Sequence, residues 1–185
     1  MADAGGWQAL SLGLFRRMRA DYAGAVEGIG PAALAWQVSP TSNTIGWLAW
    51  HIARVQDRNL SELTGAPQLW VAEGWAARFG RPADPSDTGF GHSAQQAAAF
   101  RTPNSNLLPA YQVTAHALAE RYLAAAPDGD LTRVVDSPTL GNAHTVEERL
   151  RGLITDSFAH LGQIGLLRSL VPGHRPVTGG RGAPV

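Results

Sequence analysis

The sequence predicts an all-α protein: a four-helix bundle with a long crossover connection between the second and third helices. Four long segments repeat apolar residues at the spacing of an amphipathic helix. No segment has a convincing strand pattern, and apolar residues make up 44% of the 185-residue chain, enough for one buried core. The four predicted helices cover residues 7–26, 44–64, 106–126 and 146–171.

The first two helices have clear apolar faces and clear ends. The face of the first comprises Leu10, Leu14, Met18 and Tyr22, and that helix ends at the stretch GIGP. The second follows a polar N-cap, Ser42 or Asn43, and ends at Gly65. Its apolar stripe comprises Ile45, Leu48, Ile52, Val55, Leu60 and Leu63.

The crossover between the second and third helices begins at Ala66 and breaks the helical pattern. We expect a short helix near residues 71–79, a long loop with glycines, prolines and aromatics, and another short helix at 94–100. Long loops in compact domains are usually functional or disordered, and two Trp and two Phe favour an ordered one. Pro109 fits the first turn of the third helix.

The fourth helix begins with a capping box formed by Thr145 and Glu148, and ends at Pro172. Residues 127–144, which precede it, are predicted as a polar connector, with a hairpin as the less favoured alternative. We therefore expect one domain over residues 1–171 and a flexible C-terminal tail over residues 172–185.

Composition excludes several classes of function. Fifteen basic and fifteen acidic residues cancel, so nothing indicates a nucleic-acid partner or an anionic membrane surface. No apolar run reaches the roughly 18 residues of a membrane span, no signal peptide is evident, and we expect a cytoplasmic protein. The chain has no cysteine, so a metal must be bound by nitrogen and oxygen, and any reacting thiol must come from outside.

Three ionisable residues fall on apolar stripes. Asp156 and His160 lie four residues apart on the fourth helix, and His51 shares the stripe of the second. A hydrogen-bonded Asp–His pair in the core would explain the first two. Facing helices of a bundle can also join them with His51 in a three-ligand metal site with an open position. Zinc is the first expectation, and nickel, iron or manganese would tolerate the same ligands.

The stretches NTIGWLAWHIARVQD and DSFAHLGQIGLLR resemble the second and fourth helices of the DinB-like superfamily. The resemblance extends from the first helix to Leu170 and is nearest to the actinobacterial branch of mycothiol-dependent transferases and maleylpyruvate isomerases. It implies metal ligands at His51, Asp156 and His160. Position 156 is usually His in the family and Glu in the isomerases, so Asp156, one methylene shorter than Glu, is the departure from the pattern. It could bind the metal directly if the two helices lie closer together, or bind it through a water.

The resemblance implies a metal-dependent thiol S-transferase that uses mycothiol or a similar thiol, together with an electrophilic substrate. A free thiol has a pKa near ~8.5, and coordination to a metal converts it to a thiolate. Dimerisation is common in the family, so we expect a homodimer. The alternatives are a mycothiol-dependent isomerase, a non-catalytic metal or ligand binder linked to stress, and a helical dimer with a polar core and no metal.

Four further residues are candidates for contacts with substrate or ligands. His92, at the end of the long loop, could cover the site, although a histidine at a helix start needs no such role. Arg54 and Arg58 follow His51 by one and two turns and could bind an anionic group, or form a solvated charged face. Gln163 could orient a metal ligand through a hydrogen bond.

Overall fold

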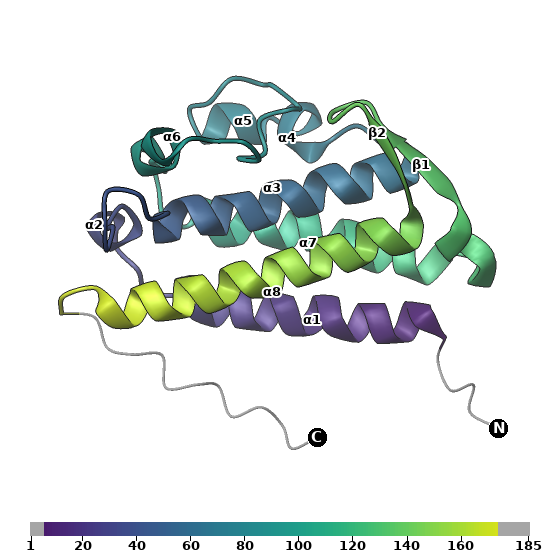
Figure 1. Ribbon diagram of the computed structural model, residues 1–185, viewed down its shortest axis with the longest axis horizontal. Helices are drawn as coiled ribbons and strands as arrows, with labels where there is room; N and C mark the ends of the chain where they lie inside the picture. Colours follow the sequence, from purple (N-terminus) through teal and green to yellow (C-terminus); the bar gives the residue numbers. More distant parts are fainter. Residues whose placement is uncertain (1–5, 174–185) are drawn as a thin grey trace, which may run out of the picture.

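The computed structural model describes residues 6–173 and confirms the predicted all-α bundle (Figure 1). Its four long helices are α1 (Trp7–Val26), α3 (Ile45–Thr64), α7 (Leu107–Ala125) and α8 (Val146–Leu170). Helices α1 and α3 each pack against both α7 and α8 around one hydrophobic core. All four lie where the sequence predicts them, because their apolar stripes provide the faces that the bundle buries. The predicted face of α1 was wrong at Leu10, which is 69% exposed, whereas Phe15 is buried with Met18 and Tyr22.

The crossover between α3 and α7 lies on the outer side of α3 (Figure 1). It carries three short helices, α4 (Leu69–Ala72), α5 (Trp75–Arg78) and α6 (Ala94–Ala99), and a fourth, α2 (Pro31–Leu34), precedes α3. The single helix predicted over residues 71–79 is two helices, because Gly74 at φ 72° interrupts the helical backbone. A capping box of Ser93 and Gln96 begins α6.

Residues 134–145 form a β-hairpin. The prediction of a connector without strands over residues 127–144 was therefore wrong, and the less favoured alternative is correct. A 3₁₀ turn (Asp128–Thr132) leads into β1 (Val134–Ser137), which pairs antiparallel with β2 (Asn142–Thr145). Gly141, at φ 67°, closes the turn and donates its N–H to the Ser137 carbonyl (2.7 Å). Strand β2 is exposed along almost its whole length, so it lacks the alternation that identifies a strand.

Helix caps fix where α3 and α8 begin. Thr44 is the N-cap of α3, one residue beyond the predicted choices, and its side chain accepts from the Trp47 N–H (3.1 Å). The capping box of Thr145 and Glu148 begins α8, as predicted. In Figure 1, α3 runs from left to right and α8 from right to left, so the middle of α8 passes the first half of α3.

None of the helices over residues 6–173 is long and apolar enough to cross a membrane. The tail predicted for residues 172–185 lies, from residue 174 onwards, outside the described residues.

Candidate metal centre

The structure brings His51, Asp156 and His160 together between α3 and α8. One potential ligand atom from each lies within 4.8 Å of the others. Asp156 Oδ2 is 3.6 Å from His51 Nε2, and Asp156 Oδ1 is 3.3 Å from His160 Nε2. The His51 side chain is 7% exposed, against 40% for Asp156, so the group extends from the core to accessible surface.

These separations fit a shared metal ion. Ligand atoms about 2.1 Å from a tetrahedral metal lie about 3.4 Å from one another. Each histidine lies close to that distance from one oxygen of Asp156, His51 from Oδ2 and His160 from Oδ1. Asp156 Oδ2 is buried and has no hydrogen-bond partner among the described residues, a costly arrangement for a carboxylate oxygen. The two-His, one-Asp group could therefore hold a divalent metal ion.

Both imidazoles turn the same nitrogen toward the site. His51 Nδ1 lies 2.5 Å from the Thr88 carbonyl oxygen, and His160 Nδ1 lies 3.0 Å from Gln163 Oε1. An oxygen of either kind can only accept, so each Nδ1 carries a proton, and in the neutral ring each Nε2 keeps the lone pair that a metal would need. Outer hydrogen bonds of this type orient metal-binding histidines.

The electrostatics of the group favour an ionised Asp156. Burial raises the pKa of Asp156, but polar contacts with His160 and His51 outweigh it and hold that pKa well below its usual range. The contact with Asp156 in turn raises the pKa of His160, against the opposing effect of burial. Without a metal, Asp156 and His160 therefore favour each other's charged form.

Trp47 forms one wall of the site. Its indole, one turn before His51 on α3, stacks on the imidazole with ring centroids 4.9 Å apart and planes 5° from parallel. It also meets the ring of His160 edge-on at 6.4 Å. These contacts restrict rotation of both histidine rings.

The crossover loop reaches the site through Thr88 and Gly89. Gly89 has φ 89°, and a Cβ there would lie 2.9 Å from both His51 Nδ1 and Trp47 Cζ2. Real Cβ atoms do not approach so closely, and only glycine adopts this backbone angle without strain. The loop backbone can therefore contact a metal ligand only because residue 89 has no side chain.

His92 lies beside the group rather than in it. Its Nδ1 accepts from Trp47 Nε1 (3.1 Å), and its Nε2 lies 3.2 Å from Asp87 Oδ1. Asp87 is also paired with Arg81 (2.7 Å). His92, which the sequence suggested could cover the site, thus fixes the crossover loop against Trp47.

Arg54 is buried away from the pocket and fully engaged. Its five N–H groups donate to the oxygens of Asp87 O (3.0 Å), Asp57 Oδ2 (3.1 Å), Tyr111 Oη (3.0 Å), Gln68 Oε1 (2.8 Å) and Pro85 O (3.1 Å). Its side chain is 0% exposed and also lies over the Trp70 ring. Arg54 therefore connects α3 to the crossover loop and has no donor left for a ligand.

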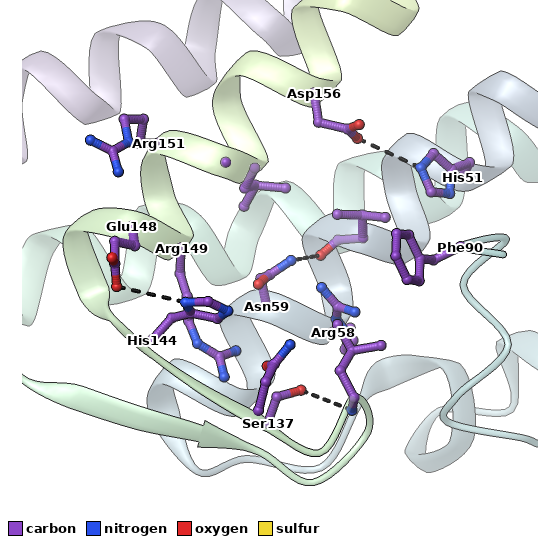
Figure 2. A pocket seen from close by; sticks show the side chains of 15 residues that line it. His51, Arg58, Asn59, Phe90, Ser137, His144, Glu148, Arg149, Arg151 and Asp156 are labelled. Carbon is purple, nitrogen blue, oxygen red and sulfur yellow. Dashed lines mark hydrogen bonds and ion pairs between the residues drawn. The ribbon is translucent and has the colours of Figure 1, made fainter.

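A cavity of about 420 Å³ opens beside the metal-ligand group (Figure 2). His51 and Asp156 lie at one end of it, and Arg58 lies between Asn59 and Phe90 in that view. Sequence reasoning missed Thr88, Gly89 and Phe90. The signal for them was the stretch TGFGHS, which indicated the correct loop, although His92 was the residue chosen from it.

The chain belongs to the DinB superfamily, whose family model matches residues 14–164. It is also similar to a solved structure, a conserved protein from Enterococcus faecalis, with 27% identity and a TM-score of 0.80. That likeness covers 92% of this chain and 99% of the other. Among curated proteins, none matches. The fold and the family predicted from the two helix motifs are thus confirmed.

Proposed function

We propose that the protein is a divalent-metal-dependent S-transferase acting on a low-molecular-weight thiol such as mycothiol. The observation that carries the proposal is the convergence of His51, Asp156 and His160, with one potential ligand atom from each within 4.8 Å of the others. The buried Oδ2 of Asp156, which has no hydrogen-bond partner among the described residues, supports it. Three protein ligands leave a position open for a substrate atom, which is typical of catalytic sites. Zinc suits this ligand set best, and nickel, iron and manganese remain alternatives.

Each residue of the group has a defined part in this proposal. His51, Asp156 and His160 would hold the metal, and the charge of Asp156 would offset part of the metal's charge. A bound metal would supply the Lewis acidity that favours a thiolate over a thiol at neutral pH. Thr88 and Gln163 keep the Nδ1 protons in place, so that neither imidazole turns away. The absence of cysteine agrees with a thiol that is supplied from outside.

Elemental analysis of the purified protein tests the metal site. We expect about one divalent ion per chain in the wild type, and loss of it in His51→Ala and His160→Ala. His144→Ala is the matched control, because His144 is an exposed pocket histidine outside the ligand group. Unchanged metal content in both site variants would show that the metal is bound elsewhere.

Conjugation of a thiol to an electrophilic bimane dye tests the activity. The metal-loaded wild type should accelerate the reaction over the metal-free protein with at least one bacterial thiol, mycothiol being the first choice. Metal bound at the site without any acceleration would favour the alternative, a non-catalytic metal-binding protein. An isomerase would give the same metal result, and would be identified by the turnover of its own substrate.

A further inference from the structure

Arg58 is a buried cation that makes no hydrogen bond to the described residues. It lies on α3 two turns after His51, lines the cavity and is 8% exposed. Within residues 6–173, no oxygen accepts a hydrogen bond from its guanidinium, and its Nε is fully buried and unpartnered. An unsatisfied buried donor is costly, and a charged one more so.

The other two arginines of the cavity have partners. Arg149 pairs with Glu62 (2.5 Å) and donates to the Val135 carbonyl (3.0 Å), and Arg151 pairs with Glu147 (3.1 Å). Arg58 is therefore the cavity arginine whose donors are uncommitted in the described part of the chain.

The acids near Arg58 are already engaged. Burial lowers the pKa of Arg58, and the charges of Glu62 and Asp156 only partly offset this, while Arg149 and Arg54 add to it. Glu62 binds Arg149 and the Ser137 hydroxyl, and Asp156 contacts the two histidines. The positive charge of Arg58 thus lacks a dedicated counterion inside the cavity.

We propose that Arg58 binds the acid group of a small anionic ligand, a carboxylate or a phosphate, whose other end reaches the His51–Asp156–His160 group. A guanidinium presents paired N–H groups that match the two oxygens of such an acid. Seven residues of helix separate His51 from Arg58, about 10 Å along the axis, so the acid must be several bonds from the atom at the metal. A cavity of about 420 Å³ suits a small molecule.

This inference deepens the proposed function and rests on it for the position of the ligand's other end. The substrate would then carry a negatively charged group several bonds away from its reacting atom. Phe90, 75% exposed at the same cavity, provides an apolar surface for the intervening carbon chain.

Calorimetric titration of the metal-loaded protein with mercaptoalkanoic acids of increasing chain length, each paired with its primary amide, tests the proposal. We expect the wild type to bind the best acid about tenfold or more tightly than its amide. Arg58→Gln should abolish that preference, and Arg151→Gln should retain it, because Arg151 is an exposed cavity arginine already paired with Glu147. A second series ending in phosphate decides which acid group fits better.

Arg58→Lys keeps the positive charge but lacks the paired N–H donors, so we expect it to reduce the preference for the acid over the amide. If thermal melting shows that Arg58→Gln does not fold, Arg58→Lys takes its place in the test. Equal binding of acid and amide by the wild type, or a preference that both Arg58 variants retain, would overturn the proposal. Alkanoic acids without sulfur test the acid-binding role of Arg58 independently of the proposed thiol chemistry. If the thiol does not reach the metal but these acids still bind in an Arg58-dependent way, the acid subsite stands and the thiol chemistry fails.

Discussion

His51 Nδ1 donates to the backbone carbonyl oxygen of Thr88 across 2.5 Å, joining residues 37 positions apart in the chain. The crossover loop therefore fixes the protonated nitrogen of a candidate metal ligand. Arg54 anchors the same loop to α3 by donating hydrogen bonds to the backbone carbonyls of Pro85 and Asp87. The site thus depends on backbone carbonyls of loop residues that lie outside the group of candidate ligands.

Gly89→Ala should weaken metal binding about 10–100-fold, because its Cβ would displace His51 and the loop carbonyl that orients it. Gly91→Ala is the matched control. Gly91 also has a positive φ, 78°, but a Cβ there would meet no atom within 4 Å. Both variants should lose about 1 kcal/mol of stability from the backbone angle. Metal titration followed by competition with a chelator measures the difference, and equal affinities for the two variants would contradict this account of Gly89.

Arg54→Met should destabilise the protein by about 3–5 kcal/mol, because it leaves the buried carboxylate of Asp57 without its cation and frees the loop. Arg17→Met, which removes an exposed pair with Asp21, should cost less than about 1 kcal/mol. Urea unfolding of the metal-free protein gives both free energies. A cost at Arg54 no larger than that at Arg17 would mean that the five hydrogen bonds contribute little.

The helices and the convergence of His51, Asp156 and His160 could be predicted because both follow the helical period. His51 and the pair Asp156 and His160 lie on apolar stripes, and stripes must face the bundle interior. The capping box at Thr145 also identified the start of α8 correctly. The period carries no information about β2, whose residues are exposed on both faces, and the hairpin was missed for that reason.

The roles of the two arginines could not be separated by sequence. Arg54 and Arg58 follow His51 on the same helix, and helical spacing alone treats them alike. Arg54 is covered by the loop around Asp87, whereas Arg58 lines the cavity. The path of the loop depends on buried polar contacts distant in sequence, such as those of Asp57 with the Leu69 and Trp70 N–H groups, which no local pattern encodes.

Gln163→Ala should lower metal affinity about tenfold while leaving the fold intact, because His160 loses the acceptor that holds its Nδ1 proton. Gln95→Ala on α6 is the control, since Gln95 is exposed and is not one of the three candidate ligands. Competition with a chromogenic chelator measures the affinities. An unchanged affinity in Gln163→Ala would show that the hydrogen bond to Gln163 is not needed to orient His160.

Asp156→Asn should remove a pH-dependent part of the stability of the metal-free protein. The pKa of Asp156 is lowered, so its contribution is complete above its ordinary value of 3.8 and is lost as the pH falls below it. The pKa of His160 is raised, so its contribution is complete below 6.5 and is lost as the pH rises through the higher folded value. The difference in stability between the wild type and Asp156→Asn should therefore be largest between pH 3.8 and pH 6.5. It should become smaller at lower and at higher pH. Urea unfolding across this range, with the pKa of His160 followed by NMR, measures both effects. A stability gap that is independent of pH, together with an unchanged His160 titration in Asp156→Asn, would mean that the two side chains are not electrostatically coupled.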